Sequence, residues 1–373
     1  MDRYVDSGAA LAQLVSAFRR EPVVAVDTEA ASFHKHRDRI YLIQLSTGAE
    51  TAIVDPLAVT DLVPLGALLG DGAVEKVFHD ADYDLRVFDR DYQFHATKVF
   101  DTRVAAQLAG ERAIGLAALL EKYLGVRLSK EHQKADWSRR PLSPEQLEYA
   151  AADARHLPAL REALRARLVE LVRLDWAGEE FQRLESLRWT ATSDGPDAYL
   201  RVKGAKALTG RQLAALRELY AWREEVAARQ DRAAFRVIGN DALLAISRAL
   251  PTTRAALTQT EGVPPSLASR HEAALLECVT RALASDEAQL PRIERRLWAP
   301  RDPAFEARVE RLKDARNRAA TELGLDAGVL CPRSTLEAVA RAQPRDRAGL
   351  ALVAELRRWQ MAAVGDALLA VMT

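Results

Sequence analysis

Short apolar, β-branched runs recur along the first 101 residues of the chain, and they predict β-strands. Each run is four to six residues long, which is the usual length of a strand. The predicted strands are residues 23–27, 41–46, 51–55, 76–79 and 97–101. From about residue 82 onward, apolar residues also recur at the three- and four-residue steps of a helix. This alternation predicts an α/β domain with helices packed on a central sheet.

Beyond residue 144 only helical periodicity is found. Ser143, Pro144 and Glu145 are typical of a helix start, and we expect this helix to reach about residue 175 with a kink near Pro158. A polar stretch rich in Gly, Ser and Thr follows and is typical of a linker. The expected organisation is an α/β domain at 1–188, a linker at 189–205, and helical domains at 206–290 and 300–373.

The two helical segments resemble each other, which indicates a duplicated small domain. Val237-Ile238 matches Val329-Leu330 at an offset of 92. Other positions match at an offset of 93, namely Leu243, Ile246 and Pro251 with Leu336, Val339 and Pro344. We therefore expect one slipped residue between the two copies.

Composition and net charge exclude few classes of function. The chain of 373 residues is 49% hydrophobic and 28% charged, which is ordinary for a globular protein, and its apolar runs are too short to span a bilayer. An N-terminus without a signal pattern, and only two cysteines, Cys278 and Cys331, favour a reducing cytoplasm. The net charge is zero, but residues 1–175 carry 23 basic against 27 acidic side chains and residues 176–373 carry 30 against 26. A positive face for nucleic acid remains compatible with this balance.

Asp27 and Glu29 stand at the end of an apolar run, two residues apart. Alternation along a strand points both side chains to the same face, where two carboxylates repel each other. The arrangement is typical either of a solvated strand end or of half a divalent-metal site. Residues elsewhere in the chain have to decide between these alternatives.

Two further stretches offer acids. Asp80, Asp82 and Asp84 precede a helix, and Asp84 is the best placed because Leu85 and Phe88 mark the buried face of that helix. Farther on, Tyr149 and Asp153 are four residues apart, which places phenol and carboxylate on one helix face. The alternative for this helix is a core tyrosine and a solvated aspartate.

The set of motifs Asp27-x-Glu29, Asp84 and Tyr149-x-x-x-Asp153 resembles the DEDDy 3′–5′ exonucleases, and among them the ribonuclease D family. LIQLS at 42–46, VFDTRVAAQL at 99–108 and the stretch 128–153 resemble further motifs of this family. The helical segments resemble the HRDC domain in a two-copy arrangement, although RecQ-type helicases carry that domain too. The second copy departs more, with Pro332-Arg333-Ser334 where the first has Asn240-Asp241-Ala242.

The resemblance implies an RNase H-like mixed sheet flanked by helices, followed by two all-α HRDC-like domains. It implies that Asp27, Glu29, Asp84 and Asp153 hold two Mg²⁺ or Mn²⁺ ions, hard cations that prefer oxygen ligands. Tyr149 would orient the attacking water. The expected activity is a metal-dependent 3′–5′ exoribonuclease that releases nucleoside 5′-monophosphates from RNA with a free 3′ end, tRNA precursors among them. We expect a cytoplasmic monomer without a membrane segment.

Substrate contacts are predicted on weaker grounds. The candidates are Phe33, Lys130, Trp137, Arg139 or Arg140, Arg229, Arg232 and Arg236. The alternative for each cation is a solvated helix face, and the alternative for Trp137 is core packing. His79 is expected to fix local geometry and Asp101 to cap a helix.

Two competing functions remain. A DNA 3′–5′ exonuclease of the same superfamily, as in Werner-type proteins, would use the same acids, because the choice of sugar depends on contacts to the 2′-hydroxyl. An RNA-binding scaffold with a decayed nuclease domain is the other alternative. The complete set of four acids and a tyrosine favours an enzyme over the scaffold.

Overall fold

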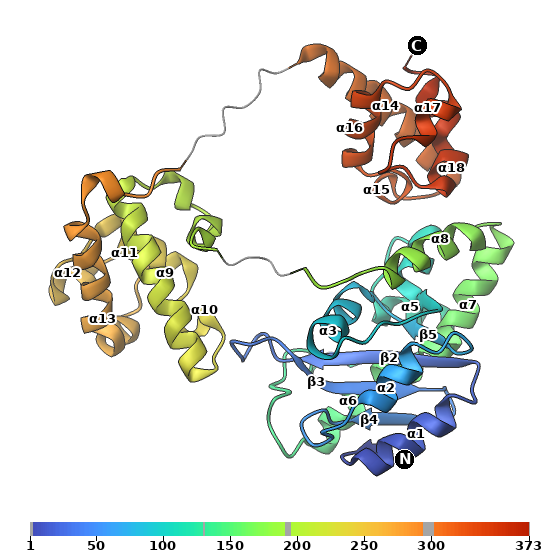
Figure 1. Ribbon diagram of the computed structural model, residues 1–373, viewed down its shortest axis with the longest axis horizontal. Coiled ribbons are helices and arrows are strands. Elements are labelled where there is room, and N and C mark those ends of the chain that lie inside the picture. Colours follow the sequence, from blue (N-terminus) through green and yellow to red (C-terminus); the bar gives the residue numbers. More distant parts are fainter. Residues whose placement is uncertain (1–2, 130, 191–194, 294–301, 373) are drawn as a thin grey trace. The chain divides into compact units, whose positions relative to one another are not determined.

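A six-stranded mixed sheet forms the centre of the N-terminal part of the chain (Figure 1). The structure is a computed structural model that describes residues 3–129, 131–190, 195–293 and 302–372. The strands are β1 (Arg3–Val5), β2 (Val23–Ala30), β3 (Ile40–Ser46), β4 (Thr51–Val54), β5 (Glu75–Phe78) and β6 (Val99–Asp101). Their order is β1-β4-β3-β2-β5-β6, and β3 runs antiparallel to both of its neighbours. The other pairs are parallel, so the predicted α/β class with a mixed sheet is confirmed.

Each of the five predicted strands is present, but three earlier elements were missed. β1 is only three residues long, and its pattern carries too little apolar signal to stand out. The helices α1 (Gly8–Phe18) and α2 (Val63–Leu69) precede residue 82, where helical periodicity was first expected. They cover one face of the sheet together with α3 (Asp82–Tyr92), and their apolar side chains form one core with Val24 and Val26.

The opposite face of the sheet is covered by the later helices of this domain. Ala25 and Val77 point to this face and share a core with four of them. These are α4 (Thr102–Leu108), α5 (Leu116–Leu124), α7 (Leu157–Glu170) and α8 (Leu174–Glu185). Side chains alternate along β2, so Asp27 and Glu29 belong to the same face as Ala25.

The helix predicted at 143–175 is broken into separate helices. α6 (Pro144–Arg155) begins with a capping box between Ser143 and Gln146, as the sequence suggested. It ends before His156, and α7 follows at once, so the expected kink is a complete break one residue ahead of the Leu157-Pro158 pair. α6 packs on β2, β3 and β4 through small side chains, since Ala150, Ala151 and Ala154 are fully buried.

Residues Ala31–Arg39 and Thr190–Leu297 form one compact unit, and the rest of the chain forms another. The first of these units is helical apart from its short loop. Its helices are α9 (Gly210–Gln230), α10 (Ala234–Val237), α11 (Asn240–Ala249), α12 (Arg254–Gln259) and α13 (Pro265–Ala284). Part of the predicted linker at 189–205 belongs to this core instead, because Tyr199, Val202 and Ala205 are buried with the side chains of α9.

The second helical copy repeats the first element by element. Its helices are α14 (Pro303–Leu323), α15 (Ala327–Leu330), α16 (Arg333–Ala342), α17 (Arg347–Ala351) and α18 (Arg358–Leu369). Every helix of this copy starts 93 residues after its counterpart, from Gly210 and Pro303 to Pro265 and Arg358. The prediction of one slipped residue between the two copies is therefore wrong. With the constant offset of 93, Val237 corresponds to Leu330. In the described part of the chain, no helix is both long and apolar enough to cross a membrane.

Candidate active site

Three of the four predicted acids converge beside the end of β2. Asp27 and Glu29 project from the strand toward the face that α6 covers, and Asp153 projects from α6. One carboxylate oxygen from each of the three lies within 4.8 Å of the others. Among the residues that the structure describes, none of these acids forms an ion pair with Lys, Arg or His. Two acids spaced two residues apart on β2 and one acid on α6 thus form one acidic cluster.

Asp84 reaches the same region from the opposite layer. It lies in the first turn of α3, is only 7% exposed, and accepts a hydrogen bond from the Thr28 hydroxyl. Its oxygen atoms lie outside the three-residue cluster, but its charge still raises the pKa of Asp27. The neighbouring candidates differ, because Asp80 pairs with Arg103 and Asp82 pairs with Arg86 at the surface.

Burial is the main cause of the raised pKa values of the four acids. It raises the pKa of Asp27 and of Glu29 well above the ordinary range, and the charges of neighbouring acids raise both further. Burial also raises the pKa of Asp84 to about 7 and that of Asp153 to about 6. Carboxylates that share a partly desolvated site without a cation fit divalent-metal ligands, because a bound cation would remove their mutual repulsion.

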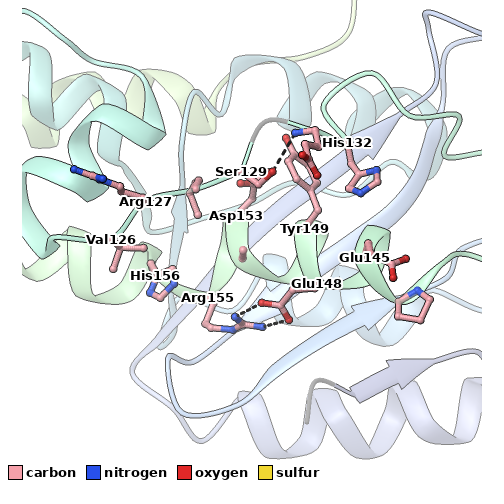
Figure 2. A pocket seen from close by; sticks show the side chains of 14 residues that line it. Val126, Arg127, Ser129, His132, Glu145, Glu148, Tyr149, Asp153, Arg155 and His156 are labelled. Carbon is pink, nitrogen blue, oxygen red and sulfur yellow. Dashed lines mark hydrogen bonds and ion pairs between the residues drawn. The ribbon is translucent and has the colours of Figure 1, made fainter.

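Tyr149 lies one turn before Asp153 on α6, and its phenol is hydrogen-bonded to the Asp153 carboxylate (Figure 2). Burial raises the pKa of Tyr149, and the negative charge of Asp153 raises it further, so the phenol stays protonated at neutral pH. The Trp137 ring stacks on Tyr149 with a centroid distance of 6.0 Å and an interplanar angle of 29°. His132 meets Tyr149 edge-on at 6.0 Å.

A cavity of about 510 Å³ opens beside these two residues of α6 (Figure 2). Tyr149 and Asp153 line it from one side, and His132 lies across from them on the segment that precedes α6. Arg127 and His156 line its other end. The cavity therefore opens beside Tyr149 and Asp153, and its lining carries both acidic and basic side chains.

Two predicted structural residues hold the turn that leads to Asp84. Asp101 caps α4 by accepting hydrogen bonds from Arg103 and Val104 backbone N–H groups, as expected. It also accepts from Ala81 N–H at 2.7 Å, which fixes the turn before α3. His79 Nδ1 lies 2.9 Å from the Thr102 hydroxyl, and burial lowers the His79 pKa to about 4, so this histidine stays neutral.

Several predicted substrate contacts are revised by their surroundings. Trp137 is 1% exposed and has no free ring face for a base, so the core-packing alternative accounts for it. Arg140 does not face solvent as a phosphate contact would, because it is paired with Asp55. Arg139 is exposed and paired with Asp136, and Lys130 lies outside the described residues.

Phe33 lies in the loop that belongs to the same compact unit as the first helical copy. It is 44% exposed and its ring contacts that of Phe235, which is 48% exposed, with a centroid distance of 5.0 Å. The Arg236 guanidinium lies over the Phe33 ring at 5.1 Å. Of the other predicted arginines, Arg229 is exposed with a long 3.8 Å contact to Glu225, and Arg232 is half-buried.

Sequence reasoning missed two polar residues of the sheet. Gln44 lies directly opposite Asp27 in the β2–β3 register, is fully buried, and its side-chain amide has no hydrogen-bond partner among the described residues. A glutamine inside the apolar LIQLS run was the available signal. Asp55, at the end of β4, is the other residue, and its signal was a buried strand ending in an acid.

Fold and site together define the chain as a 3′–5′ exonuclease. A family model described as 3'-5' exonuclease matches residues 3–169, and the HRDC domain model matches residues 212–279 and 305–372. Ribonuclease D of Pseudomonas paraeruginosa is 32% identical over 368 residues, which cover 98% of this chain and 96% of that protein. The chain belongs to the ribonuclease D family.

Further relatives agree with this assignment. Ribonuclease D of Escherichia coli is 34% identical over 285 residues, or 76% of this chain and 75% of that protein. The crystal structure of E. coli RNase D, described as an exoribonuclease involved in structured RNA processing, matches with a TM-score of 0.72 and 28% identity. That match covers 100% of this chain and 98% of that chain. The protein is thus a 3′–5′ exoribonuclease with two HRDC domains.

Proposed function

We propose that this exoribonuclease works with two divalent metal ions, Mg²⁺ or Mn²⁺, held by Asp27, Glu29, Asp84 and Asp153. The observation that carries the proposal is the cluster of three half-buried carboxylates with oxygens within 4.8 Å of each other and no cationic partner among the described residues. Bound metal would supply an activated water and would neutralise charge on the scissile phosphate. The products would be nucleoside 5′-monophosphates.

The side chains of the chain have separate roles in this proposal. Asp27 and Glu29 share a strand face, and the charge of Asp84 raises the pKa of both, so both would hold metal together with Asp84 and Asp153. Tyr149 stays protonated and donates its one O–H to Asp153, so its phenol oxygen would accept a hydrogen bond from the water and orient it rather than remove its proton. Asp84 is held by Thr28, which sets the direction of its carboxylate.

We propose RNA with a free 3′ end as the substrate, with tRNA precursors among the RNAs trimmed. The description of the E. coli structure as acting in structured RNA processing supports this class of substrate. Phe33 remains the best candidate for a base contact, since an exposed ring with a guanidinium over its face suits stacking on a nucleotide. Arg139, Arg229 and Arg232 remain proposed phosphate contacts. A cytoplasmic monomer stays a prediction.

The test is degradation of a 5′-labelled single-stranded RNA and of the matching DNA, each with Mg²⁺, with Mn²⁺ and with chelator. We expect ladders that shorten from the 3′ end of the RNA, depend on metal, and release 5′-monophosphates. Preferential shortening of the DNA would replace the substrate proposal with the DNA alternative. Equal RNA degradation in chelator and in metal would contradict the metal proposal.

A further inference from the structure

Arg140 is the centre of a hydrogen-bond chain that begins at the edge of the sheet. Its guanidinium donates two hydrogen bonds to the Asp55 carboxylate, at 2.6 and 2.8 Å. It also donates to the Tyr41 carbonyl at 2.9 Å and to the Trp137 carbonyl at 2.8 Å. One side chain thereby ties the segment before α6 to the end of β4 and to the start of β3.

Asp55 is itself held from the other side. Tyr4, on β1, donates a phenol hydrogen bond to Asp55 at 2.5 Å, and the Leu57 backbone N–H donates at 2.9 Å. Burial raises the pKa of Asp55, but the hydrogen bonds from Arg140 and Tyr4 outweigh it and leave the pKa below its ordinary value. Asp55 therefore stays ionised at neutral pH and keeps its bidentate pair with Arg140.

The other end of this chain lies against Tyr149. Trp137 is 1% exposed and stacks on the Tyr149 ring, on the helix that also carries Asp153. The indole N–H makes no hydrogen bond within the described residues, so its side chain has no polar tether of its own. The position of Trp137 then depends on packing and on its backbone carbonyl, which Arg140 holds.

We propose that the Tyr4–Asp55–Arg140 chain is a positioning device that sets the orientation of Tyr149 through the stacked Trp137 ring. Arg140 and Asp55 are positioning residues here, since neither lines the cavity beside Tyr149. The inference rests on the proposed role of Tyr149 in orienting water. A phenol displaced by about 1 Å would lower turnover by up to about 100-fold without weakening RNA binding.

The test is a double-mutant cycle between Arg140→Gln and Tyr149→Phe, with kcat and KM measured on 5′-labelled RNA. If Arg140 acts through Tyr149, Arg140→Gln lowers kcat by about 10- to 100-fold in the wild-type background and leaves KM nearly unchanged. In the Tyr149→Phe background the same substitution changes kcat by less than about threefold, because there is no phenol left to misplace.

The matched control is Arg161→Gln, which breaks another partly buried arginine–carboxylate pair of the same domain. Arg161, on α7, lies 2.5 Å from Glu75 at the start of β5, while the acidic cluster lies at the opposite end of β2. Both arginine variants lose stability in thermal unfolding, but only Arg140→Gln loses kcat. Arg140→Lys recovers only part of the loss, since one ammonium cannot reproduce the planar fork that reaches Asp55 and both carbonyls.

Mn²⁺ binding, measured separately from turnover, tests whether Arg140→Gln leaves the metal site intact. Titration of Arg140→Gln with Mn²⁺, followed by the paramagnetic signal of free ion, is expected to match the wild type within about twofold. An equal loss of kcat in both backgrounds, a loss confined to KM, or weakened Mn²⁺ binding would each overturn the inference. Absence of metal-dependent degradation by the wild-type protein would instead refute the proposed function, so the two failures are distinguishable.

Discussion

Two sets of acids in the same sheet have opposite surroundings: Asp55 is the first set, and Asp27 with Glu29 is the second. Asp55 is buried at the end of β4 with Arg140 and Tyr4 as partners, and its pKa lies below the ordinary value although burial alone would raise it. Asp27 and Glu29 are half-buried near the end of β2 among other acids, and the loss of solvent contact raises the pKa of each. The comparison teaches that this sheet pairs a carboxylate with arginine where it serves structure. It leaves carboxylates without a cationic side chain at the place where we propose that a metal binds.

The largest effect is expected from a substitution in the second set, Asp27 and Glu29. Asp27→Asn removes a proposed ligand whose carboxylate lies among the other acids, and we expect kcat on RNA to fall by about a thousandfold or more. The measurement is single-turnover degradation of 5′-labelled RNA with saturating Mg²⁺. Circular dichroism of the variant serves as the control for folding. Near-normal turnover would remove Asp27 from the proposed site.

The same aspartate-to-asparagine substitution at Asp55 is expected to lower the free energy of unfolding. Asp55→Asn leaves the Arg140 guanidinium without its charge partner inside the domain, and such a loss typically costs about 3–5 kcal/mol. Asp27→Asn, by contrast, relieves repulsion and should make the metal-free protein more stable than the wild type. Urea unfolding in chelator measures both variants. Equal destabilisation by the two substitutions would contradict the distinction between the two sets.

Added Mg²⁺ should stabilise the protein only through the second set of acids, Asp27 and Glu29 with their neighbours. With Mg²⁺ at about 100 times its dissociation constant, linkage predicts a gain of about 2.7 kcal/mol in the free energy of unfolding of the wild type. Asp27→Asn should lose most of this gain, whereas Arg161→Gln should keep it, because its pair with Glu75 lies away from the acids. Thermal unfolding with and without Mg²⁺ gives the comparison. A gain that survives Asp27→Asn unchanged would place the stabilising ion elsewhere.

Local patterns predicted most of the fold and offered the acids as candidates, which the resemblance to the exonuclease family then selected. The strands at 23–27 and 41–46 are buried runs, and the two-residue and four-residue periods of their elements place Asp27 with Glu29 and Tyr149 with Asp153 on shared faces. Asp84 was selected over Asp80 and Asp82 because Leu85 and Phe88 mark the buried face of α3, and the structure buries Asp84 among these three. Such features depend only on neighbours in sequence.

Long-range pairs could not be predicted in this way. Arg140 resembled a phosphate contact because nothing near it in sequence reveals Asp55, which lies 85 positions earlier. Trp137 was ambiguous for the same reason, since its burial depends on α6 and on the sheet together. Tyr199 and Val202 were assigned to a linker because their burial requires α9, which follows them in the chain.

The smallest effect is a pH dependence that differs between the two sets. Asp84, with its pKa raised to about 7, and Asp153, at about 6, favour the protonated form when folded. Their contribution to stability is present below the ordinary pKa of about 4 and is lost as the pH rises to about 7. Asp55 has the opposite sign, because its lowered pKa gives stability above about pH 4 that is lost as the pH falls further.

Metal-free protein should therefore be most stable near pH 4 and should lose stability steadily as the pH rises to 7. Urea unfolding in chelator across this range measures the loss. Asp84→Asn should flatten part of the upper limb, because one of the groups whose deprotonation drives it is gone, while the acid limb set by Asp55 stays. Mg²⁺ should flatten the upper limb of the wild type as well, since a bound cation stabilises the ionised carboxylates. An upper limb that Asp84→Asn leaves unchanged would mean that Asp84 does not lose its proton in this pH range.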